Sequence, residues 1–198
     1  MTGMQEDLRA KILESTPHIY VLEQSASLHL LDWESVVDSV LAVDGIVGAA
    51  PFAQSEVSVL RRGESGNYPQ SASLLGIDID SSRAPATEME RQIVEGALDL
   101  GPPPSGMPPL LMGSILADRM QVFEGDTLVL MSLENLNADI FGGYTPTVRQ
   151  FEVTGTFTTG MYDYDIKNVY TTLEAAQDLI GLEPGTASGI GARTADPE

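Results

Sequence analysis

Residues 150–165 of the chain read Q-F-E-V-T-G-T-F-T-T-G-M-Y-D-Y-D, and the organisation of the whole sequence follows outward from them. The first half of this segment alternates, with Phe151 and Val153 on one face of an extended chain and Glu152 on the other. Its β-branched and aromatic side chains favour a strand over a helix. Gly160 then permits a sharp turn, because glycine tolerates positive φ. The segment therefore predicts a strand and a turn at a junction between two lobes.

The turn after Gly160 contains two carboxylates, Asp163 and Asp165, interleaved with two tyrosines. Aspartate side chains in turns commonly accept hydrogen bonds from backbone N–H groups, so one interpretation is a well-capped turn. The alternative is a metal or acid/base site, because carboxylates two residues apart lie on the same side of an extended chain. No histidine or third acid lies nearby in the sequence, and the capped turn is therefore favoured.

The same segment carries a resemblance to a known family. The run F-x-x-G-M-Y-D-Y-D is preceded by R-Q-F-E-V-T-G and followed by N-V-Y-T-T-L-E-A-A-Q-D-L-I-G-L. Together these runs closely resemble the extracytoplasmic domain of lipoprotein-releasing ABC transporter permeases of the LolC/LolE type. Those permeases belong to the larger FtsX family, whose members share a MacB-like periplasmic core.

The resemblance implies an α+β fold in which one lobe is inserted into another. It implies a membrane-proximal helix at residues 1–15. A Porter lobe, rich in β-α-β units, is expected at residues 16–80 and 160–198. A mainly β Sabre lobe is expected at residues 81–159, with a protruding Hook at residues 133–148.

The residue patterns predict an alternation of strands and helices along the chain. We expect helices at residues 1–15, 33–43, 87–93, 114–121 and 173–180, with Asp32 as the N-cap of the second. We expect strands at residues 18–22, 46–62, 71–77, 110–113, 124–132, 169–172 and 188–193. Residues 133–148 are predicted to be a loop of about sixteen residues, a length that is usually functional or disordered.

Composition narrows the classes of function. The 198 residues include 29 acidic and 10 basic side chains, a formal charge of −19, which argues against nucleic acid and anionic membrane surfaces as partners. There is no cysteine, and this excludes thiol catalysis, disulfides and zinc ribbons. No apolar run is long enough to span a membrane, so the resemblance identifies the chain as the periplasmic insert of an inner-membrane protein, without its transmembrane helices.

The sequence contains no nucleophile–base constellation, no phosphate-binding glycine loop and no metal-binding histidine pair. We therefore expect no enzyme, no cofactor and no metal. The resemblance implies instead a domain that extracts lipoproteins from the inner membrane and hands them to a periplasmic chaperone. Its implied partners are a second permease subunit, a cytoplasmic ATPase, the chaperone and the lipoprotein. The alternatives are a MacB-like efflux or FtsX-like signalling permease and, in another class, a carboxylate-based hydrolase.

The Hook is where the resemblance implies chaperone docking. Residues 133–148 lie at the position of that hairpin, and Gly142 and Gly143 would supply its turn. Exposed aromatic groups suit a docking tip, because buried aromatic anchors dominate the energy of many interfaces. A disordered surface loop is the alternative. The residues predicted to contact the partner are Ile140, Phe141, Tyr144, Thr145, Pro146 and Arg149.

The strong negative charge and the lack of a phosphate-binding loop predict that the chain does not bind nucleotides. Titration of the chain with ATP and magnesium in a calorimeter is expected to give no heat of binding. A micromolar dissociation constant would show that the prediction is wrong.

Overall fold

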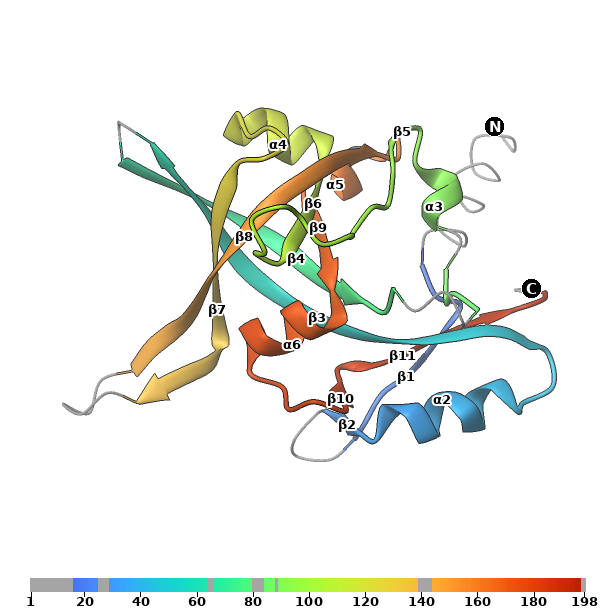
Figure 1. The fold of residues 1–198 in the computed structure, drawn as a ribbon. Coiled ribbons are helices and arrows are strands. Elements are labelled where there is room, and N and C mark those ends of the chain that lie inside the picture. Colours follow the sequence, from blue (N-terminus) through green and yellow to red (C-terminus); the bar gives the residue numbers. More distant parts are fainter. Residues whose placement is uncertain are drawn as a thin grey trace. The chain divides into compact units, whose positions relative to one another are not determined.

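Figure 1 shows the computed structural model, which describes residues 16–24, 29–63, 66–79, 84–87, 89–138 and 144–196. The chain divides into two compact units. The first is drawn from residues 1–52, 78–93 and 185–198, and the second from residues 53–77 and 94–184. Helices and strands are mixed in both, which confirms the expected α+β class. The expected helix at residues 1–15 lies outside the described residues, and the Porter and Sabre boundaries stay a prediction.

The first unit is a small sheet with a helix. Its sheet has the order β1–β11–β3, with antiparallel pairing of β11 to both neighbours. A second pair of short antiparallel strands joins β2 to β10. The elements of this unit are β1 (Ile19–Val21), β2 (Leu30–Leu31), α2 (Trp33–Leu41), the first part of β3 (Ile46–Gly63), α3 (Met89–Gln92), β10 (Thr186–Ala187) and β11 (Gly189–Thr194).

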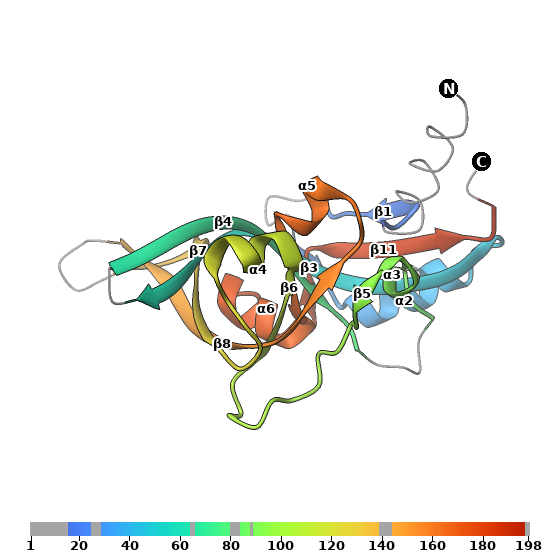
Figure 2. The ribbon, with the colours of Figure 1, turned by 90° about the horizontal axis from the view of Figure 1, so that it is seen from above.

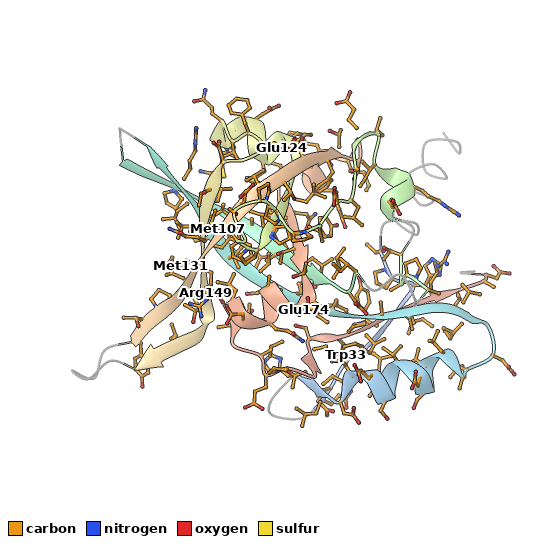
Figure 3. The ribbon with its side chains drawn as sticks, in the orientation of Figure 1. Trp33, Met107, Glu124, Met131, Arg149 and Glu174 are labelled. Atoms are coloured by element: carbon orange, nitrogen blue, oxygen red, sulfur yellow. The ribbon has the colours of Figure 1, made fainter. Side chains whose placement is uncertain are left out.

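Helix α2 closes the core of the first unit with one apolar stripe. Trp33, labelled in Figure 3, lies on this helix. Trp33 and Val37 are buried one turn apart, and Ile190 of β11 is buried as well. Asp32 occupies the N-cap position, but its backbone is left-handed, at φ 49° and ψ 51°, and its side chain makes no capping hydrogen bond. The predicted N-cap position is therefore confirmed, but without the side-chain hydrogen bond, because an N-cap oxygen reaches the first-turn N–H groups from an extended backbone.

The second unit is built on a closed ring of six strands. Strand β7 pairs with both β3 and β8, and this closes the order β3–β4–β9–β6–β8–β7 on itself (Figure 2). The pairs β4–β9 and β6–β8 are parallel, whereas β6–β9, β3–β7 and β7–β8 are antiparallel. The strands that complete the ring are β4 (Gly66–Ile77), β6 (Pro109–Gly113), β7 (Thr127–Ala138), β8 (Tyr144–Thr158) and β9 (Asn168–Thr172).

Strand β8 includes residues 150–158, for which the sequence predicts an alternating strand. Phe151, Val153 and Phe157 are fully buried, so the predicted alternation is confirmed. The register against β6 shifts at Thr154, whose hydroxyl donates to the carbonyls of Asp99 and Leu110. The short strand β5 (Glu95–Gly96) adds to the end of β8.

Helix α6 (Leu173–Ile180) begins and ends where the sequence predicts. The Thr172 hydroxyl accepts a hydrogen bond from the Ala175 N–H, and Gly181 ends the helix at φ 77°. The helix contacts β4, β7, β8 and β9, so it lies across one opening of the ring. Gly76 of β4 permits this close packing, because a Cβ there would collide with the Ala176 methyl group. The helix is held by buried Leu173, Ala176, Leu179 and Ile180.

Two further helices follow the ring strands. Helix α4 (Ser114–Met120) follows β6, and α5 (Tyr162–Asp165) follows β8. Gly113, at the end of β6, lies so close to α5 that a Cβ there would overlap the carbonyl group of Asp165. The obstacle is backbone, which cannot rotate away as a side chain does.

We predict that Gly113→Ala lowers the free energy of unfolding by about 1–3 kcal/mol, the usual range for overpacking a rigid site. Gly155→Ala is the matched control, because a Cβ at that position would meet only the Leu111 side chain at an ordinary 3.4 Å. Urea denaturation measures both changes. Equal midpoints for the two variants would contradict the proposed packing of β6 against α5.

Candidate functional site

The predicted loop at residues 133–148 is wrong for its described part, because residues 133–138 and 144–148 lie in strands β7 and β8. Strand β7 continues to Ala138 and β8 begins at Tyr144, with Leu136 opposite Pro146 and Ala138 opposite Tyr144. We refer to residues 136–138 and 144–146 as the ribbon. In Figure 1 the two strands extend together toward the tip at the lower left. Its identification with the Hook that the resemblance implied stays a prediction.

The ribbon leaves the ring at a break in register. Ser132 pairs with Thr147 and, on its other side, with Val57 of β3. The next pair along the ribbon is Leu136 with Pro146, so residues 133–135 of β7 have no counterpart on β8. Extra residues on one strand bend a ladder locally. The ribbon therefore begins at a built-in joint.

One face of the ribbon and its base is apolar and exposed. Tyr144, Pro146 and Val148 alternate along β8 and so project from the same face, which they share with Leu136 because it lies opposite Pro146. The exposed fractions are 72% for Tyr144, 46% for Leu136 and 45% for Val148. We call these four residues the apolar face.

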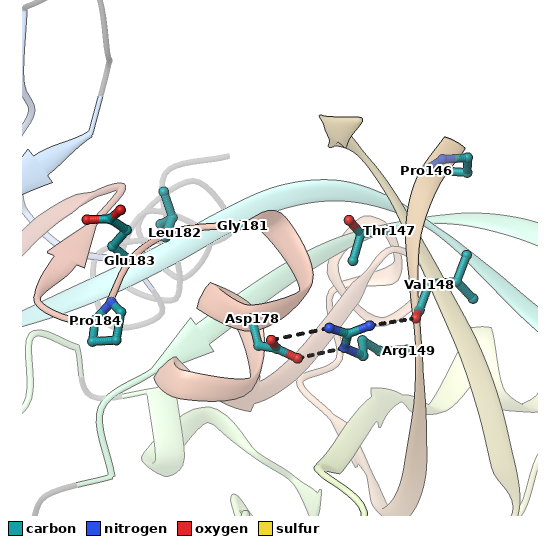
Figure 4. Close-up of a pocket in the computed structure, with 9 residues that line it drawn as sticks. All are labelled: Pro146, Thr147, Val148, Arg149, Asp178, Gly181, Leu182, Glu183 and Pro184. Carbon is teal, nitrogen blue, oxygen red and sulfur yellow. Dashed lines mark hydrogen bonds and ion pairs between the residues drawn. The ribbon is translucent and has the colours of Figure 1, made fainter. Parts of the chain in front are cut away.

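A groove of about 570 Å³ lies beside the base of the ribbon. One wall is β8, from Pro146 to Arg149, and the other is the end of α6 with the segment that follows it (Figure 4). Apolar and charged groups both line it. Besides residues 146–149, the lining residues are Asp178, Gly181, Leu182, Glu183 and Pro184.

Arg149 spans this groove. Its Nε donates to Asp178 Oδ2 at 2.7 Å, and its Nη2 donates to Asp178 Oδ1 at 3.4 Å. Its Nη1 donates to the Val148 carbonyl at 3.3 Å (Figure 4). The hydrogen bond from Arg149 to Asp178 and the charge of Asp178 raise the pKa of Arg149 above its usual value. The pair is solvent-exposed, so its electrostatic strength is moderated by water.

The six residues predicted to contact a partner are distributed along this region. Ile140 and Phe141 lie outside the described residues. Tyr144 and Thr145 are exposed on the ribbon, whereas Pro146 and Arg149 line the groove. Their role in binding stays a prediction.

Two components of the site were not predicted. Val148 and Leu136 belong to the apolar face, and the alternation of Tyr144, Pro146 and Val148 along β8 is the signal that would have identified it. Asp178 is 29 positions from Arg149, and no local pattern signals that pairing.

The two carboxylates of the turn do not form a shared site. Residues 162–165 are helical, not extended, so Asp163 is exposed while Asp165 is buried, with 1% of its surface accessible. The Asp165 carboxylate accepts from the Thr159 N–H at 2.9 Å, the Thr159 hydroxyl at 2.8 Å and the Gly160 N–H at 3.1 Å. The capped-turn interpretation is therefore confirmed for Asp165.

The described residues contain neither a metal-binding cluster nor a membrane-spanning helix. In that part of the chain, no cluster of three or more histidine or acidic side chains is placed to hold a metal ion. Within the same residues, no helix has the length and apolar character needed to cross a membrane.

Comparison with known sequences supports the resemblance. No protein-family model matches the chain. The chain is 25% identical over 183 residues to the lipoprotein-releasing system transmembrane protein LolC of Xylella fastidiosa, an alignment that covers 92% of this chain and 41% of the relative. The chain thus spans less than half the length of that relative.

Solved structures share the fold. The periplasmic region of MacB from Actinobacillus actinomycetemcomitans matches with a TM-score of 0.54 at 14% identity, over 89% of this chain and 73% of that one. The extracellular domain of the noncanonic ABC-type transporter YknZ from Gram-positive bacteria matches with a TM-score of 0.52 at 13% identity, over 90% and 82%. The expected LolC-like sequence and MacB-like fold are therefore confirmed.

The buried carboxylate gives a test of the turn. We predict that Asp165→Asn lowers the free energy of unfolding by about 1–3 kcal/mol, because the new amide group leaves a buried N–H without an acceptor. Asp163→Asn, at the exposed position, is expected to change it by less than about 0.5 kcal/mol. Thermal and urea denaturation measure both. A midpoint of the unaltered chain that rises on adding calcium or manganese would point to the metal site instead.

Proposed function

We propose that the chain is the periplasmic domain of an ABC transporter permease that extracts lipoproteins from the inner membrane and hands them to a periplasmic chaperone. Two similarities support this proposal: the sequence likeness to LolC across 92% of the chain, and the fold of the MacB periplasmic region. In this proposal ATP is hydrolysed in a separate cytoplasmic subunit and a second permease subunit completes the transporter. The domain itself acts as a mechanical and docking part.

The observation that carries the docking role is the exposed apolar face on the ribbon. Isolated exposed apolar residues are normal, but here three of the four apolar-face residues are more than 40% exposed on one face of a projecting two-stranded element. A partner that covers Tyr144 would bury a large aromatic ring whose hydroxyl can keep a polar contact. Such amphipathic anchors are enriched among the residues that dominate interface energies.

The chemistry of the face suits an apolar groove on the partner. Cross-strand pairing already orders the backbone of the ribbon, so less ordering remains to be done on binding. An ordered ribbon therefore docks with less entropic cost than a loop of the same length.

A second candidate is supported by the structural matches. MacB and YknZ share this fold, so an efflux or signalling permease of the same architecture is the alternative. In the lipoprotein proposal the apolar face docks a periplasmic chaperone, so binding of that chaperone is the discriminating measurement.

We predict that the double variant Tyr144→Ala/Pro146→Ser weakens binding of the periplasmic lipoprotein chaperone of the same organism by at least about tenfold, the loss expected on truncating one interface anchor. The control is Tyr162→Ala, which removes an equally large exposed ring from α5. Surface plasmon resonance on the full chain measures the affinity, and circular dichroism checks the fold. Unchanged affinity in the folded double variant would exclude the ribbon as the docking element.

A further inference from the structure

We infer that Asp178 is a positioning residue for the ribbon: its carboxylate holds Arg149 at the base of β8 and so sets the direction in which the apolar face is presented. The positioning of the ribbon is a matter of geometry within the second unit. Its consequence for partner binding rests on the proposed function.

The ribbon needs an anchor because the other ring strands pair with β7 and β8 only below its base. Among the described residues, β7 last pairs with β3 at Ser132, and β8 first pairs with β6 at Glu152. Residues 133–135 add the break in register between these points and the tip. A two-stranded hairpin is marginally stable alone, so the direction of this one depends on contacts at its joint.

Arg149 lies at the base of the ribbon, opposite Leu130 of β7 and two positions from Thr147, the partner of Ser132. Its guanidinium is held on two sides, by both carboxylate oxygens of Asp178 and by the Val148 carbonyl. A bidentate arginine–carboxylate pair restrains direction as well as distance.

Asp178 is a suitable anchor because α6 is packed against the ring strands. Four apolar side chains of the helix are buried across the ring opening, and Asp178 lies on the opposite, exposed side. The pair therefore ties the base of the ribbon to α6. Its exposure limits its contribution to an equilibrium constant to a factor of about two to five, which biases the ribbon without determining whether the chain folds.

The test measures the order of the ribbon in the full chain without any partner. In Asp178→Asn we expect backbone hydrogen–deuterium exchange at residues 144–147 to be faster by a factor of about two to five, with an unchanged urea midpoint. Asp163→Asn, which removes an exposed carboxylate from α5, is the control and is expected to leave this exchange unchanged. At about 1 M salt the unaltered chain is expected to approach the variant, because charges are then screened within about 3 Å.

A charge exchange separates positioning from simple loss of charge. Arg149→Asp alone is expected to accelerate exchange in the ribbon as Asp178→Asn does, and Arg149→Asp combined with Asp178→Arg is expected to restore it. Unchanged exchange in Asp178→Asn, or no recovery in the exchanged pair, would overturn the inference.

The affinity for the chaperone is then measured on the same proteins. If Asp178→Asn weakens binding by a similar factor, the positioning role extends to docking. If the unaltered chain does not bind the chaperone at all, the proposed function fails while the exchange data still decide the role of Asp178. If Asp178→Asn frees the ribbon but binding is unaffected, the inference that Asp178 presents the apolar face is wrong.

Discussion

The structure of the second unit depends on the double pairing of β7. By pairing with β3 through residues 129–132 and with β8 through residues 127–132, this strand closes six strands into a ring. Closure leaves no unpaired edge within the ring and encloses a core that includes Leu128, Leu130 and Phe151, all fully buried. Helix α6 adds its apolar side across one opening, and Asp165 secures the turn at the end of β8.

The same strand explains why the ribbon is exposed. Both β7 and β8 are longer than their pairing with the rest of the ring, so they continue together past Ser132 with nothing but each other as a described strand partner. Their side chains have no core to enter there. Apolar residues on that face remain in water, which is costly unless another surface covers them. A projecting ribbon of this composition is understandable as an interface.

The sequence predicted those parts whose pattern is local. Alternation identified the buried face of β8, and the bounds predicted for α6, residues 173–180, are the observed ones. Prediction failed at residues 133–138 and 144–148, which lie in β7 and β8 and not in a loop. Pairing across the ribbon places even Pro146 opposite Leu136. The contact between Arg149 and Asp178 was beyond prediction, because it arises only when the ring brings β8 beside α6.

The acidic composition of the chain means that the pairing of Arg149 with Asp178 is not explained by charge alone. With 29 acidic and 10 basic residues, an arginine has many carboxylates within reach of a long side chain, so charge alone does not select its partner. In the second unit Arg61, Arg149 and Lys167 each meet a carboxylate from a different element, at Asp126, Asp178 and Glu56. Among these pairs, only Arg149 engages its carboxylate with two guanidinium nitrogens. Arg61 lies near Asp126 through Nη2 and donates from Nη1 to the Met120 carbonyl. Geometry selects Asp178, and that geometry is set by the buried side of α6.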